Sequence, residues 1–136
     1  MSISNQKGDV GEAAFALAAA KRGYWTAKMP QDCPYDFVLD KKDGTILRVQ
    51  VKYRSVSKTG TVMIKMVQHK EHCKANRQTY TSENIDALAV YVADSDIVFL
   101  IPVADIGTID EVTFRCNPSK NNQTHNVRMI TQYAIW

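Results

Sequence analysis

The sequence predicts a single α/β or α+β domain with a mixed central β-sheet flanked by helices. Three observations predict it: an alanine-rich helical segment near the N-terminus, a hairpin pattern directly after it, and two continuous apolar strands later in the chain. The 136 residues suit one domain with a modest core. We find no repeat or linker that divides residues 1–136.

The first element is a helix predicted from about Gln6 to Arg22, with Gly23 as its stop signal. Its apolar face is expected to comprise Val10, Ala13, Ala14, Leu17 and Ala18. Glu12 lies about 160° from the centre of that face, among further apolar residues. The helix is therefore apolar nearly all round, and Glu12 is expected to be partly buried. A helix-start glutamate stabilised by the helix dipole is the alternative.

The hairpin follows after a predicted strand at 24–29. Residues 34–40 read as a strand that carries Asp36 among aromatic and apolar neighbours, and a lone buried carboxylate is costly. Asp43-Gly44 is a strong turn signal. On the returning strand, successive side chains alternate, so Gln50 and Lys52 share one face. Antiparallel pairing is expected to bring Asp36 close to both.

An acid, an amide oxygen and an ammonium at one point suit phosphodiester hydrolysis. Mg²⁺ prefers oxygen ligands, usually one or two carboxylates with phosphate oxygens and waters. Such an ion activates water and neutralises charge on phosphorus, and a lysine can stabilise the transition state. A structural ion pair between Asp36 and Lys52 in an ordinary hairpin is the alternative interpretation.

The spacing of Asp36, Gln50 and Lys52 after a helix with Glu12 resembles the PD-(D/E)XK nuclease superfamily. The sequence departs from the family pattern twice: Tyr35 separates Pro34 from Asp36, and Gln50 replaces the usual acid. The resemblance implies a restriction-endonuclease-like core that uses Mg²⁺ or Mn²⁺. The catalytic residues that it implies are Glu12, Asp36, Gln50 and Lys52, and the implied metal ligands are Glu12, Asp36, Gln50 and Val51.

Positive charge is concentrated in the first part of the chain. The net charge of +3 divides into +7 over residues 1–78, −6 over residues 79–118 and +2 over residues 119–136. A basic excess beside the hairpin is expected for a polyanion ligand, although a solvated basic surface gives the same pattern. The residues expected to contact DNA are Tyr53, Arg54, Ser55, Lys58, Lys65, Lys70, Lys74, Arg77, Lys120, Asn121, Asn122 and Gln123.

The strands at 85–92 and 97–102 are continuously apolar, which predicts that both of their faces are covered. Further strands are predicted at 61–66 and 112–116. A loop or short helix facing DNA is predicted at 67–83, and a polar loop, which is either a DNA contact or a disordered surface segment, at 117–126. The C-terminal Tyr133–Trp136 is expected to pack on the core or on another subunit.

Three cysteines, an odd number, favour free thiols in a reducing cytoplasm. We expect neither a signal peptide nor a membrane span, because no apolar stretch is long enough. His69, His72 and Cys73 are too crowded to favour a zinc site and have no fourth ligand nearby.

Within the superfamily, the chain is most similar to the cyanobacterial group I intron-encoded homing endonucleases. That resemblance implies a site-specific endonuclease for double-stranded DNA and a homotetramer. A dimer is the smallest alternative, because two antiparallel strands call for a two-fold pair of sites. Other possible functions are a Holliday-junction resolvase and a catalytically inactive DNA-binding module.

Overall fold

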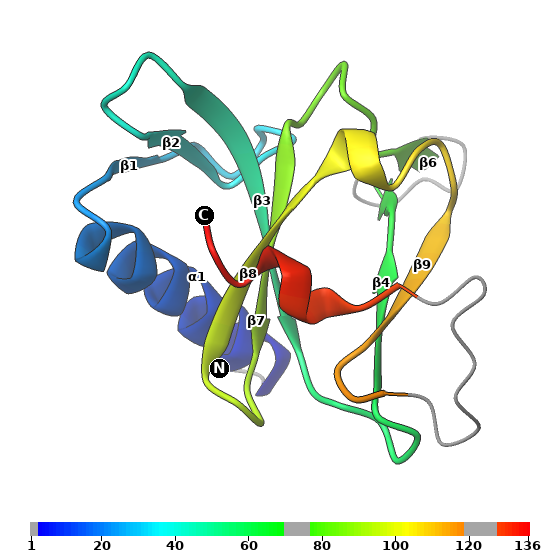
Figure 1. The fold of residues 1–136 in the computed structure, drawn as a ribbon. Helices are drawn as coiled ribbons and strands as arrows, with labels where there is room; N and C mark the ends of the chain where they lie inside the picture. Colours follow the sequence, from blue (N-terminus) through cyan, green and yellow to red (C-terminus); the bar gives the residue numbers. More distant parts are fainter. Residues whose placement is uncertain (1–2, 70–76, 119–127) are drawn as a thin grey trace.

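The computed structural model, which describes residues 3–69, 77–118 and 128–136, is built around one five-stranded sheet (Figure 1). The strand order is β1-β2-β3-β7-β8. The bounds are β1 Trp25–Lys28, β2 Phe37–Asp40, β3 Ile46–Arg54, β7 Ala87–Val92 and β8 Ile97–Pro102. Only the β3–β7 pair is parallel within this sheet, so the sheet is mixed. The predicted fold class is confirmed.

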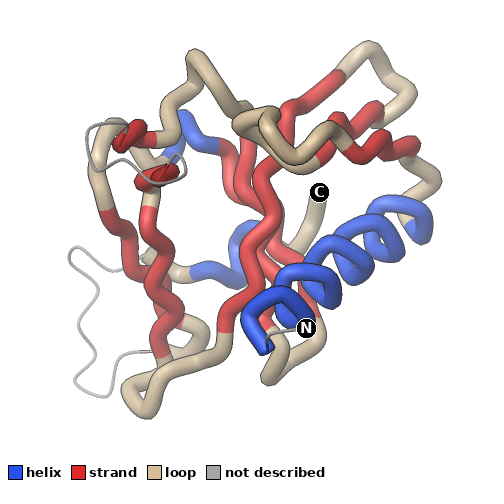
Figure 2. The backbone as a smooth tube through the Cα atoms, turned by 180° about the vertical axis from the view of Figure 1, so that it is seen from behind, coloured by secondary structure: helices blue, strands red, loops and turns tan. Residues whose placement is uncertain are grey.

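The helix α1, Ile3–Lys21, covers one face of the sheet, as seen from behind in Figure 2. It starts three residues earlier than predicted. Its buried residues are Gly11, Phe15 and Ala19. The predicted apolar face is wrong, since Val10 is 49% and Leu17 57% exposed. A helix that is apolar nearly all round gives no clear periodicity, and the large Phe15 ring determines which side faces the sheet.

The opposite face is covered mainly by strands. β4 (Thr61–Lys65) pairs with β9 (Glu111–Arg115), and β5 (Val67–His69) pairs with β6 (Arg77–Thr79). Two short 3₁₀ helices, η2 (Val103–Asp105) and η3 (Ile130–Tyr133), complete this layer. The prediction of a loop or short helix at 67–83 is wrong for the residues that form β5 and β6. The polar composition of this segment gives no strand signal, although β5 and β6 are close in sequence and pair with each other.

Both faces of the two apolar strands are covered, as predicted. Every residue of β7 is buried, and only the two end residues of β8 are exposed. One cluster of buried residues, with Phe15, Leu39 and Val49, lies between α1 and the sheet. A second cluster, with Ile64 and Phe114, lies between the sheet and the strand layer. The sheet therefore separates two cores.

The C-terminal Trp136 packs within the subunit. Its ring stacks on Phe15 at 5.9 Å between centroids, and Arg22 lies over it at 3.8 Å. Its indole N–H donates to the Val98 carbonyl at 3.0 Å. By contrast, Ile135 is 94% exposed. The tail is thus docked on its own core through its tryptophan. No helix among the described residues is long and apolar enough to cross a membrane.

Candidate active site

The candidate site lies at the start of β2. Beyond this point β2 no longer runs beside β3, so one edge of β3 is open. The register pairs Phe37 with Val49, and beyond this point β3 continues beside β7 alone. Asp36 stands at this opening. Its amide donates to the Val49 carbonyl at 2.9 Å, and its Oδ2 accepts the Val51 N–H at 2.9 Å. The carboxylate therefore satisfies an edge donor that no strand reaches.

Glu12 and Asp36 line the same cavity, of about 480 Å³, between the start of α1 and this edge. Val51 completes the wall on the β3 side. Because the N–H and C=O of one strand residue point to the same edge, the Val51 carbonyl also faces the opening. The lining residues are Ser4, Asn5, Gly8, Asp9, Glu12, Gln31, Asp36 and Val51.

Nearby positive charge and hydrogen bonding compensate only part of the cost of burying the Asp36 carboxylate. Burial, above all, raises the pKa of its carboxyl above the ordinary value, and the negative charge of Glu12 adds to the rise. The Val51 N–H and the charges of Lys52 and Lys28 oppose it. Glu12 is partly buried, as predicted, with 22% of its side chain exposed. Its Oε2 lies 3.2 Å from the Lys28 ammonium.

Lys52 approaches the site from the other face of β3. Val49 and Val51 pack in the core under α1, so the alternation of the strand turns Gln50 and Lys52 towards the second core. Burial lowers the pKa of the Lys52 ammonium, Arg54 lowers it further, and the charge of Asp36 opposes the shift. Its Nζ lies 5.3 Å from the centre of the Tyr80 ring.

Gln50 is half-buried and stands beside Leu88 in the register between β3 and β7. It is not among the residues that line the acidic cavity. The structure therefore brings Glu12, Asp36 and Val51 together in one cavity, with Lys52 close enough to act on the pKa of Asp36.

The donor set of the cavity fits a hard divalent cation. The Glu12 and Asp36 carboxylates and the Val51 carbonyl are the kind of oxygen ligands that Mg²⁺ and Mn²⁺ take. Burial is the main cause of the raised pKa of Asp36, and the negative charge of Glu12, which adds to the rise, is charge that a cation would neutralise. No group of three or more His, Cys, Asp or Glu side chains gathers within the described ranges. A metal held here would thus need the Val51 carbonyl, Gln50 or ligands from the substrate.

The residues predicted to contact DNA divide into several groups. Tyr53 packs in the helix–sheet interface against Tyr91, with ring centroids 5.6 Å apart. The Arg54 guanidinium donates to the carbonyls of Met63 and Tyr53, which ties β3 to β4. Ser55, Lys58 and Lys65 are exposed. For Arg77, the structure describes only the backbone, in β6. Lys70, Lys74, Lys120, Asn121, Asn122 and Gln123 lie outside the described residues.

Several residues at or next to the site were not identified from the sequence, among them Lys28, Gln31 and Tyr80. Lys28 pairs with Glu12, Gln31 lines the cavity, and Tyr80 covers Lys52. Lys28 could have been found, because in an antiparallel pair it stands opposite Phe37, next to Asp36. Tyr80 could not, because its position depends on the folding of the second layer.

This fold, with an acidic cavity beside a lysine at an open strand edge, places the chain in the nuclease class. The chain belongs to the PD-(D/E)XK endonuclease family, whose model matches residues 3–136. The predicted resemblance to this superfamily is thereby confirmed, and the protein is a DNA endonuclease. Enzymes of this family typically use divalent metal ions.

One solved structure similar to this chain is that of the bacterial homing endonuclease I-Ssp6803I. The TM-score is 0.72 with 22% sequence identity, and the match covers 91% of this chain and 86% of that one. At this identity, the likeness shows a shared fold. No match is found among curated proteins.

Proposed function

We propose that this endonuclease cuts double-stranded DNA at a specific sequence, as a homing endonuclease does, with Mg²⁺ or Mn²⁺ as its cofactor. The observation that carries the proposal is the Asp36 carboxylate, fixed to the open edge of β3 by the Val51 N–H at 2.9 Å. Glu12 lies in the same cavity, and Lys52 acts on Asp36 from the adjacent strand position. The fold shared with a homing endonuclease supports the finer assignment.

In this proposal, the residues divide the work by their chemistry. Asp36, Glu12 and the Val51 carbonyl hold the divalent ion, and Gln50 adds an uncharged oxygen. The bound ion supplies Lewis-acid activation of water and neutralises charge on the phosphate. Lys52 stabilises the charge that develops on the non-bridging oxygens, in a partly desolvated site where such stabilisation is strong. A cation at this site would compete with Lys28 for the Glu12 carboxylate.

The test is incubation of the protein with genome-scale DNA and Mg²⁺, followed by sequencing of all new ends. Discrete ends at a few positions, with 5′-phosphate and 3′-hydroxyl groups, are expected. Ends spread over the whole DNA would contradict site specificity. Cutting confined to four-way junctions would instead identify a Holliday-junction resolvase. Binding without cutting in any metal would identify an inactive DNA-binding module, a possibility because Gln50 replaces an acid.

We further propose that the working unit is a homo-oligomer, a tetramer or at least a dimer. The exposed side of α1 carries Ile3, Val10 and Leu17 at seven-residue intervals, 71%, 49% and 57% exposed. This outer stripe of α1 is apolar surface that the subunit leaves uncovered. Its occupant in this proposal is a second copy of the chain, because cutting two antiparallel strands requires two sites.

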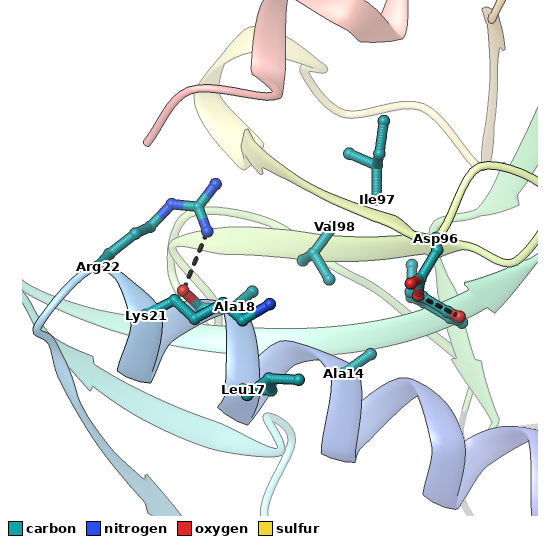
Figure 3. Close-up of a pocket in the computed structure, with 9 residues that line it drawn as sticks. Ala14, Leu17, Ala18, Lys21, Arg22, Asp96, Ile97 and Val98 are labelled. Atoms are coloured by element: carbon teal, nitrogen blue, oxygen red, sulfur yellow. Dashed lines mark hydrogen bonds between the residues drawn. The ribbon is translucent and has the colours of Figure 1, made fainter.

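The surface beside the outer stripe of α1 suits a two-fold contact with a second copy. A hollow of about 260 Å³ lies between α1 and β8, and Leu17 is among the residues that line it (Figure 3). Lys21 and Asp96 both line it, so each copy would offer a cation and an anion to the other. A two-fold axis would allow the Leu17 of each copy to enter the hollow of the other.

Sedimentation equilibrium at micromolar concentration tests this contact. The wild type is expected at two or four times the 15.3 kDa monomer mass. Leu17→Lys should shift it towards the monomer, whereas Ile135→Lys, at an even more exposed apolar position on the tail, should not. A monomeric wild type that still cuts both strands would contradict the oligomer, and an unaffected Leu17→Lys would contradict this surface.

A further inference from the structure

The Lys52 side chain is surrounded by protein but has no acidic partner in direct contact. Burial lowers the pKa of its ammonium, and no carboxylate among the described residues forms an ion pair with it. Its contact is the face of the Tyr80 ring, 5.3 Å from Nζ to centroid. A cation over an aromatic face is attracted by the ring quadrupole, and most strongly when water is excluded.

Tyr80 is held firmly enough to direct this contact. The residue is 3% exposed and belongs to the core between the sheet and the strand layer. Its amide donates to the Met66 carbonyl at 2.7 Å, directly after β4. The segment that follows it turns at once, with the Thr81 amide bound to the Asn84 side chain at 2.8 Å. Hydrogen bonds therefore hold the backbone both at Tyr80 and at the residue after it.

The turn after Tyr80 is fastened to β3 itself. The Arg48 guanidinium donates to the carbonyls of Ser82 and Glu83, each at 2.9 Å, and to the Asp86 carboxylate. Arg48 precedes Lys52 by four residues on the same strand. The ring and the ammonium are thus attached to one rigid element, and their separation does not depend on a mobile loop.

We propose that Tyr80 is a positioning residue of the nuclease site: the face of its ring keeps the Lys52 ammonium beside Asp36. This inference rests on the proposed role of Lys52. Without the ring, a flexible four-carbon side chain would lose the surface that directs it, and its ammonium would reach the phosphate less often. The pKa of the Tyr80 hydroxyl, raised to about 12 mainly by burial, leaves the ring neutral throughout the working range.

The test compares two replacements of Tyr80 with one control in the same core. Tyr80→Phe keeps the aromatic face, whereas Tyr80→Leu keeps apolar bulk but removes it. Phe99→Leu makes the same change at a residue 3% exposed in the same cluster. Single-turnover cleavage by Tyr80→Leu should be slower by about tenfold, with DNA affinity unchanged. Tyr80→Phe and Phe99→Leu should stay within about threefold of the wild type.

Three results would overturn the proposal. Cleavage by Tyr80→Leu at the wild-type rate would remove the ring from any positioning role. Equal losses in Tyr80→Leu and Tyr80→Phe would assign the effect to the hydroxyl. An equal loss in Phe99→Leu would assign it to general damage of the core.

A second measurement does not depend on cleavage. In a double-mutant cycle of Tyr80→Leu with Lys52→Met, the shifts in unfolding temperature should be non-additive, because the two side chains interact. Tyr80→Met replaces Tyr80→Leu if the latter does not fold. If the wild type cuts no DNA but the cycle is non-additive, the proposed function fails and the Lys52–Tyr80 contact stands. If the wild type cuts and the cycle is additive, the contact fails alone.

Discussion

Two aspartates hold the same strand in the same way but in opposite electrostatic surroundings. The Oδ2 of Asp86 accepts the Arg48 N–H at 2.7 Å, and the Oδ2 of Asp36 accepts the Val51 N–H at 2.9 Å. The Arg48 side chain pairs with Asp86 and lowers the pKa of that carboxyl. Burial and Glu12 raise the pKa of Asp36. The charge of Asp86 is neutralised by its ion pair with Arg48. No ion pair among the described residues neutralises Asp36, so its carboxylate is available to a cationic ligand.

The difference separates a structural acid from a functional one. Asp86 with Arg48 joins β3 to the turn before β7, and every charge in this pair has its partner. Asp36 lies where β2 no longer runs beside β3. Of the cations that act on it, Lys28 is paired with Glu12 and Lys52 lies over the Tyr80 ring. Perturbed acids of this kind cluster at functional sites. The comparison can be tested by mutating each side.

The largest effect is expected on the cleavage rate when Asp36 or Lys52 is changed. Asp36→Asn and Lys52→Ala should each reduce the single-turnover rate by about 100-fold or more, because each removes a charge from the transition state. Asp86→Asn serves as the matched control and should cut within about tenfold of the wild type. Wild-type cleavage by either of the first two variants would show that the acid–lysine site is misplaced.

A smaller effect is expected at Gln50, because it brings an oxygen without charge. Gln50→Glu should keep or tighten the dependence of cleavage on Mg²⁺, and Gln50→Leu should cleave about tenfold more slowly than the wild type. The comparison requires metal titrations of the cleavage rate for both variants. A fully active Gln50→Leu enzyme would remove Gln50 from the site, consistent with its absence from the lining of the acidic cavity.

Local rules predict part of the candidate site, whereas its surroundings depend on packing that such rules do not describe. Asp36 and Lys52 were placed together because strand alternation and a hairpin turn are local rules. The inner face of α1 was not predictable, because Val10 and Leu17 are as apolar as the residues that are buried. The contact of Tyr80 with Lys52 depends on the second layer, in which β4 pairs with β9, a strand distant in sequence. No local pattern encodes such pairings.

Asp86→Asn should lower the unfolding free energy, whereas Asp36→Asn should raise it. Without metal at neutral pH, Asp86→Asn should lower it by roughly 1–2 kcal/mol, because a charge-assisted pair is lost. Asp36→Asn should raise the unfolding temperature by about 1–4 °C, because a buried charge is removed while an acceptor for Val51 remains. Denaturation at matched pH measures both. A loss of stability in Asp36→Asn equal to that in Asp86→Asn would erase the distinction.

The pH dependence of these differences follows from the two pKa shifts. A raised pKa gives a contribution that is fully present below the ordinary carboxyl pKa and is lost as pH rises through the folded value, so the destabilisation by Asp36 grows across this window and is complete above it. A lowered pKa gives stability that is lost as pH falls through the folded value, as for Asp86. Thermal melts in an acid series should therefore show both differences shrinking towards zero.

The smallest effect is expected for single surface cations in DNA binding. Lys58→Ala should flatten the dependence of log K on log salt by about 1, since one phosphate contact releases its counterions. Lys41 lies at the β2–β3 turn, at the other end of the hairpin, and Lys41→Ala should leave the slope unchanged. Fluorescence anisotropy over a salt series with uncut DNA measures this. Equal slopes for the wild type and Lys58→Ala would place Lys58 away from the phosphates.

Metal-dependent stabilisation tests the central claim most directly. An ion that binds only the folded protein raises its stability, so the wild type should gain about 10 °C once Mn²⁺ exceeds its Kd about a hundredfold. Asp86→Asn should start from a lower unfolding temperature and show the same gain, whereas Asp36→Asn should show almost none. An equal gain in Asp36→Asn and the wild type would contradict the assignment of Asp36 as the acid that holds the metal.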